Sequence, residues 1–72
     1  MQNLSVKETN YLKDLMSWEL LSTKKCFQYA HQETMPDRQK IFFDTAQMHQ
    51  QNYLNLVNYI EQIVNKQGGR LH

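Results

Sequence analysis

The chain contains very few residues that break a helix, and their positions limit what it can fold into. In 72 residues there is one proline, Pro36, and there are two glycines, Gly68 and Gly69. Proline lacks a backbone donor and glycine is conformationally free, so both residue types gather where helices begin or end. Two long uninterrupted segments remain, one before Pro36 and one after it. Apolar residues recur at helical spacing in both segments, which predicts two long helices.

Signals at the segment ends set the predicted boundaries. Ser5, with Glu8 three residues later, has the pattern of a capping box, in which two side chains satisfy two free backbone amides. Thr34 can cap the second helix, whose first turn then contains Pro36. The two glycines are typical of a helix C-cap. We therefore predict one all-α domain over residues 1–72, made of a helix over about 6–33, a turn near 34–36, a helix over about 35–67 and a short tail over 68–72.

Two long helices joined by a tight turn must lie antiparallel, and a hairpin cannot cover both of its apolar sides alone. A lone hairpin is expected to leave several large apolar side chains exposed: Trp18, Phe42, Phe43, Tyr53 and Ile60. The chain is also small, so it hides only about 60% of its unfolded surface. Its one cysteine, Cys26, allows no internal disulfide and is expected to act as a small buried apolar residue. We therefore expect a homodimer, in which two hairpins form a four-helix bundle.

Glu19 and His49 each lie at the centre of an otherwise apolar helical face. On a helical wheel the neighbours of Glu19 are Leu12, Leu15, Ser22 and Cys26, and those of His49 are Phe42, Ala46, Tyr53, Leu56 and Ile60. A turn near Met35 lies 16 residues after Glu19 and 14 before His49, so folding the chain back brings the two to about the same height. A carboxylate that faces an imidazole there is either a hydrogen-bonded polar pair or part of a metal site.

The residues around His49 favour the polar pair. Four-helix carboxylate-bridged iron proteins use a Glu on one helix and Glu-x-x-His on its neighbour. The residue three before His49 is Ala46, so the bridging carboxylate of that pattern is missing. We expect a buried Glu19–His49 pair and no cofactor. The alternative is that Glu19 and His49 of two subunits together hold one Zn²⁺ or Fe²⁺.

Charge and composition argue against several classes of function. Eight Lys and Arg residues against seven Asp and Glu leave a net charge of +1, and no basic stripe follows either helix, so we expect no nucleic-acid partner. No long apolar run is present, so we expect neither a membrane-spanning helix nor a signal peptide, and an intracellular protein. No glycine-rich loop precedes a helix, and Cys26 has no histidine at helical spacing, so we expect no enzymatic activity.

Asn and Gln occupy fifteen positions of the chain. Many of them gather on the outer side of the second helix, at Gln47, Gln51, Asn52, Asn55, Asn58, Gln62 and Asn65. This side is polar but nearly uncharged, and the simplest interpretation is a solvated surface. Two other interpretations remain open: a surface suited to dense assembly, where charges would have to be desolvated, and a face that an adaptor presents to another protein.

Three segments of the chain resemble a known family. YLKDLMSWELL at residues 11–21, KKC at residues 24–26 and AQMHQQNY at residues 46–53 resemble short members of the spore coat protein F-like group, which are ferritin-like helical proteins of spore-forming Firmicutes. The similarity extends from about Leu4 to Ile60. It implies a ferritin-like architecture and an association with the spore or its coat, and it implies no demonstrated catalysis. Since the chain is about half a usual ferritin-like unit, the other two helices would come from a second copy.

These inferences lead to one expectation and one main alternative. We expect a non-enzymatic structural or assembly protein of the spore or spore coat, with a second copy and other coat or assembly proteins as partners. The alternative is a degenerate ferritin-like metal-binding protein that uses Glu19 and His49 across a dimer.

Overall fold

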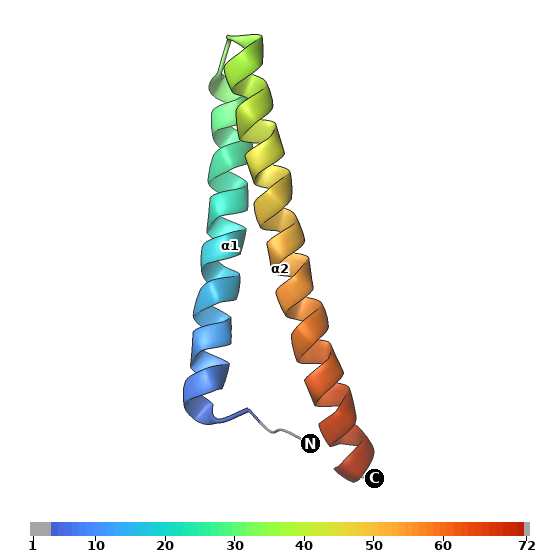
Figure 1. Ribbon diagram of the computed structural model, residues 1–72. Coiled ribbons are helices and arrows are strands. Elements are labelled where there is room, and N and C mark those ends of the chain that lie inside the picture. Colours follow the sequence, from blue (N-terminus) through green and yellow to red (C-terminus); the bar gives the residue numbers. More distant parts are fainter. Residues whose placement is uncertain (1–3, 72) are drawn as a thin grey trace.

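The protein is an antiparallel hairpin of two α-helices, α1 (Val6–Gln32) and α2 (Pro36–Leu71) (Figure 1). The computed structural model describes the backbone of residues 4–71 and the side chains of residues 4–65. Within the described backbone every regular element is a helix. The molecule measures 54 × 20 × 14 Å, with the turn at one end and the start of α1 and the end of α2 at the other. The predicted all-α hairpin is therefore confirmed.

The predicted capping box forms at the start of α1. The backbone amide of Glu8 donates to Ser5 Oγ at 3.1 Å, and the amide of Ser5 donates to Glu8 Oε1 at 3.1 Å. Both bonds satisfy amides that have no partner within the helix. The other end of α1 lies at Gln32, because Glu33 is extended and its amide donates to the carbonyl of Tyr29 at 2.9 Å.

The start of α2 differs from the prediction. The helix begins at Pro36, and its first hydrogen bond runs from the amide of Gln39 to the carbonyl of Met35 at 2.9 Å. Met35 therefore holds the capping position that was predicted for Thr34. The amide of Met35 donates to Glu33 Oε1 at 3.1 Å, so a carboxylate from the end of α1 satisfies it. Proline fits the first helical position because its missing N–H would have had no partner there.

The end of α2 also differs from the prediction. The helix does not stop at Gly68 and Gly69 but continues to Leu71. No glycine of the described backbone has a positive φ, so neither adopts the left-handed conformation of a C-cap. Glycine permits that conformation without requiring it, and it costs only about 1 kcal/mol relative to alanine inside a helix. The predicted tail is therefore wrong for residues 68–71, and His72 lies outside the described residues.

The two helices meet along one seam whose positions are spaced three and four residues apart. The least exposed side chains on it are Thr9, Leu12, Met16, Glu19, Thr23, Cys26 and Ala30 of α1 and Gln39, Phe42, Ala46, His49, Tyr53, Leu56 and Ile60 of α2. This spacing is the one that keeps two helices in continuous contact along their length. Of the described side chains, only Thr23, Ala30 and Ala46 are fully buried.

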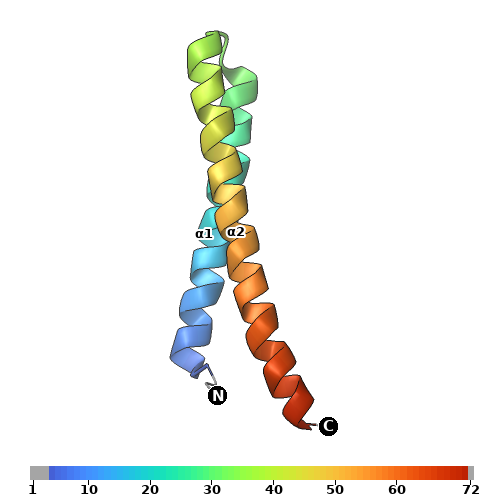
Figure 2. The ribbon, with the colours of Figure 1, turned by 45° about the vertical axis from the view of Figure 1, so that its right-hand side comes forward.

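The hairpin is tight near the turn and open at the other end. The three buried residues are small and lie in the half nearest the turn, where they allow the helices to approach closely. Aromatic rings close this end, with centroids 6.1 Å apart for Phe27 and Phe43 and 5.6 Å apart for Tyr29 and Phe42. Figures 1 and 2 show the helices side by side at the turn and separating toward the termini.

The prediction that a lone hairpin leaves five large apolar side chains exposed is correct for one of them and wrong for the other four. Trp18 is 64% exposed, as predicted. Phe42, Phe43, Tyr53 and Ile60 are only partly exposed, because they lie on the seam or beside it and pack against the other helix. The exposed apolar surface is therefore found on the flanks of the hairpin and not along its seam.

Candidate functional site at Glu19 and His49

The structure brings Glu19 and His49 together across the seam. His49 Nδ1 lies 3.0 Å from Glu19 Oε2. The two residues come from different helices, and their similar distances from the turn place them at the same height, as the sequence predicts. Among the described residues, this is the only side chain–side chain hydrogen bond that joins α1 to α2. The pair therefore fixes the register of the hairpin at its middle.

The pair is less buried than the helical wheel predicts. The side chain of His49 is 24% exposed and that of Glu19 is 22% exposed. The reason is that the helices separate between this pair and the end of the hairpin away from the turn (Figure 1). In addition, no second layer of described residues covers the flank of the hairpin. A groove of about 330 Å³ opens beside Glu19, lined by Leu15, Glu19, Asn52, Asn55 and Leu56.

Thr23 and Ala46 define the space next to the pair. Thr23 is 7% exposed, and its hydroxyl donates to the backbone carbonyl of Glu19 at 2.7 Å, which satisfies the buried oxygen. Ala46 is fully buried, one turn from His49. The ferritin-like pattern has a carboxylate at this position, but here the position lies where the helices are closest. The packing thus leaves room for a methyl group where a bridging carboxylate would stand.

The hydrogen bond leaves one nitrogen of the imidazole open. When His49 carries its proton on Nδ1, it donates to the Glu19 carboxylate, and Nε2 then has a free lone pair. A carboxylate that orients a histidine in this way is common behind metal-binding imidazoles. Among the residues with described side chains, no three His, Cys, Asp or Glu residues come together. One hairpin therefore offers this pair and no complete metal site.

Two polar contacts of the seam were not predicted. Gln39 Nε2 donates to the backbone carbonyl of Ala30 at 2.9 Å and ties the helices together near the turn. Thr23 is the second, as described above. A signal for Gln39 does exist in the sequence, since it lies seven residues before Ala46 and fourteen before Tyr53, on the same face of α2.

Other polar and reactive side chains of the described chain are partly or fully exposed. His31 is exposed, and its ring lies edge-on to Phe43 with centroids 5.8 Å apart. Cys26 is only partly buried, so the prediction of a buried apolar residue holds in part. The seven Asn and Gln residues on the outer side of α2 are all exposed, and Gln51 donates to Asn55 at 2.9 Å. The predicted polar surface of α2 is therefore exposed, but Asn52 and Asn55 lie beside the seam, since they line the groove next to Glu19.

The fold and the pair define a two-helix antiparallel hairpin with one Glu–His contact across its seam. Comparisons of the chain with protein-family models, curated proteins and solved structures find no match. Neither helix, over the residues described, combines the length and the apolar character needed to cross a membrane.

Proposed function

We propose that the protein is a non-enzymatic structural or assembly component that acts as a homodimeric four-helix bundle. The observation that carries this proposal is the lack of a core within one hairpin. Of the described residues only Thr23, Ala30 and Ala46 are buried, and no large side chain is fully buried. A chain of this size needs more apolar burial than that to be stable alone.

The exposed surface supports the same conclusion. The hairpin exposes 5864 Å², whereas a compact monomer of 8.7 kDa exposes about 4,700 Å². The excess is about 1,100 Å². A standard protein–protein interface covers about 800 Å² on each partner. The surplus surface of one hairpin is therefore large enough to form a stable interface with a second copy.

The polar groups support a packing role. Glu19 and His49 are hydrogen-bonded to each other, and Thr23 and Gln39 bond to backbone carbonyls. Among the described residues, every buried side-chain nitrogen or oxygen has a hydrogen-bond partner. Two of these contacts, Glu19 with His49 and Gln39 with Ala30, join the helices and hold them in register, which is the role that a structural protein requires of them.

Subunit count is the direct test of the proposal. Native mass spectrometry and sedimentation equilibrium of the purified chain at micromolar concentration should give twice the 8.7 kDa of one chain. A chain that stays monomeric over the whole micromolar range contradicts the proposal.

The location is a separate part of the proposal. The resemblance of residues 11–21, 24–26 and 46–53 to spore coat protein F-like proteins supports the spore or its coat as the place of assembly. Fractionation of sporulating cells of the source organism, with detection by antibody, should find the protein in the spore fraction. Detection only in vegetative cells contradicts this location.

A second candidate function is metal binding, and the orientation of His49 is the observation that favours it. Because Nδ1 faces Glu19, Nε2 is available, and a dimer would contribute two such histidines and two carboxylates. Native mass spectrometry after incubation with Zn²⁺ or Fe²⁺ should then show one ion per dimer. The ion should be absent from His49→Gln and retained by His31→Gln. Wild-type protein without stoichiometric metal rules this function out.

A further inference from the structure

We infer that, in the homodimer, Trp18 of each copy occupies the groove beside the Glu19–His49 pair of the other copy. The inference rests on the proposed homodimer and names the surface through which it forms. It also means that the site at Glu19 and His49 is complete only when the second copy closes its open side.

Of the thirteen large apolar side chains that are exposed among the described residues, seven gather on one flank of the hairpin, which we call the aromatic face. It comprises Tyr11, Leu15, Trp18 and Tyr29 of α1 and Ile41, Met48 and Tyr59 of α2, each between 42% and 64% exposed. Within each helix the steps between these residues are those that return to the same side. The α1 and α2 residues of this face lie on the same flank of the hairpin. Tyr11 of α1 and Tyr59 of α2 line one groove, and Tyr29 of α1 lies against Phe42 of α2.

A protruding side chain and a groove lie next to each other on this face. Trp18 is the most exposed aromatic residue of the described chain. The groove, of about 330 Å³, lies directly beside it, since Leu15 and Glu19 of its lining are within one turn of Trp18. A two-fold axis that passes between the two features places each Trp18 in the groove of the other copy. Buried tryptophans commonly contribute much of the binding energy of such interfaces.

The polar groups around the groove are ones that can be covered. Leu15 and Leu56 supply apolar surface, and Asn52 and Asn55 supply uncharged amides. The one charged group of the lining, Glu19, already has His49 as a hydrogen-bond partner. Covering the groove therefore leaves the Glu19 carboxylate with a hydrogen-bond partner, and amides are less costly to desolvate than ionised groups.

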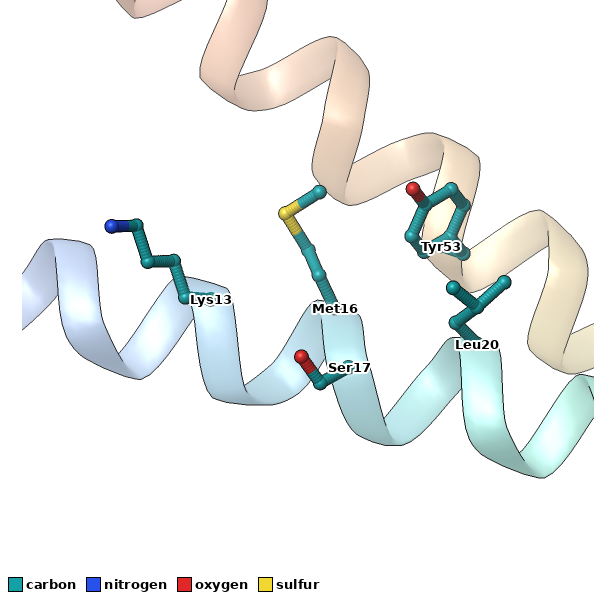
Figure 3. Close-up of a pocket in the computed structure, with 5 residues that line it drawn as sticks. All are labelled: Lys13, Met16, Ser17, Leu20 and Tyr53. Atoms are coloured by element: carbon teal, nitrogen blue, oxygen red, sulfur yellow. The ribbon is translucent and has the colours of Figure 1, made fainter.

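The opposite flank of the hairpin fits a partner less well. Its groove, of about 320 Å³, is lined by Lys13, Met16, Ser17, Leu20 and Tyr53. Figure 3 shows Met16 reaching from α1 toward α2 and Leu20 facing Tyr53, so side chains of both helices line this groove. Covering it would also remove water from the Lys13 ammonium, which is strongly hydrated. These differences favour the aromatic face as the interface.

Trp18 is the only tryptophan, so its fluorescence reports the proposed contact directly. Diluting the dimer until it dissociates should shift the emission to longer wavelength and increase quenching by acrylamide. Circular dichroism on the same samples shows whether the helices persist. Where they unfold on dissociation, the emission of the intact dimer decides, because a Trp18 outside the interface stays 64% exposed and is readily quenched. If dissociation occurs and the emission and quenching do not change, Trp18 is not in the interface.

A matched pair of variants tests the groove. Asn52→Glu places a carboxylate in the groove lining, and Asn58→Glu places the same carboxylate on α2 away from the seam; both residues are exposed. The dimer dissociation constant should rise about tenfold or more for Asn52→Glu and change little for Asn58→Glu. Trp18→Ala should weaken the dimer as much, whereas Leu20→Ala on the opposite flank should not.

The outcomes separate the inference from the proposal on which it rests. If wild-type protein is monomeric, both fail. If it is dimeric but Asn52→Glu and Trp18→Ala leave its affinity unchanged while Leu20→Ala weakens it, the homodimer stands and this interface is wrong. If a variant fails to fold, the fluorescence of the wild-type dimer still decides the position of Trp18.

Discussion

Glu8 makes the cap of α1 dependent on pH. The backbone amide of Ser5, and after it the Ser5 hydroxyl, lower the pKa of Glu8 below its ordinary value of 4.5. A carboxyl group with a lowered pKa in the folded protein stabilises it above the unfolded-state pKa, and this contribution is lost as the pH falls through the folded-state value. Wild-type protein should therefore be more stable than Glu8→Gln at neutral pH, and the difference should vanish in acid. Urea midpoints of the two proteins, measured at neutral pH and at a pH below the folded-state pKa of Glu8, check this.

The control for this prediction is Glu61→Gln, which removes an exposed carboxylate outside the cap. Its difference from wild type should vary less with pH than that of Glu8→Gln. An equal pH dependence for the two variants would mean that the cap does not hold the Glu8 carboxylate.

The Glu19–His49 hydrogen bond can be measured as a coupling between two substitutions. Both side chains are less than one quarter exposed, and the bond joins the two helices. We expect a coupling free energy of about 1 kcal/mol in a double-mutant cycle of Glu19→Ala and His49→Ala. Denaturant unfolding of the four proteins at one protein concentration gives this value. Strictly additive effects would show that the contact does not contribute to stability.

At the scale of the helices, the close approach near the turn depends on small side chains. Ala46 is fully buried in the seam, whereas its neighbour Gln47 is exposed. Ala46→Leu should destabilise the protein by about 1–3 kcal/mol, because the larger side chain forces the helices apart. Gln47→Leu, which adds an apolar group on the outside, should change stability far less. Similar unfolding midpoints for the two variants would show that the seam at Ala46 is not tightly packed.

The sequence predicts the helices better than it predicts their ends. The capping box at Ser5 is a local pattern, and the structure contains it. The start of α2 depends on how the turn folds, because the Glu33 carboxylate reaches the Met35 amide only in that geometry. The end of α2 was wrong because the two glycines allow a C-cap and also allow a helix to continue.

The same distinction applies to the candidate site. Counting residues from the turn correctly places Glu19 opposite His49, because both helices have the same rise per residue. The exposure of the pair could not be predicted from a helical wheel, which contains no information about the separation of the helices. That separation follows from side-chain sizes along the seam, small at Ala30 and Ala46 and large at Tyr53.

For the whole molecule, the proposed homodimer links stability to concentration. When folding and association are coupled, a higher protein concentration favours the folded dimer by mass action. The melting temperature should therefore rise with concentration, with a gain of about 1.4 kcal/mol in apparent stability for each tenfold increase. Thermal melts followed by circular dichroism over the micromolar range measure this shift. A constant melting temperature, together with a monomeric mass, would contradict the homodimer.

The tight turn end also has a consequence for the order in which the chain folds. Gln39 and Ala30 are joined across only nine positions of sequence, whereas Glu19 and His49 are separated by thirty. Contacts between residues close in sequence form faster, because less chain entropy is lost in closing the loop. We expect the helices to join first beside the turn and then progressively toward the termini. Amide hydrogen exchange should accordingly be slowest around Ala30 and Ala46 and should become faster toward the open end.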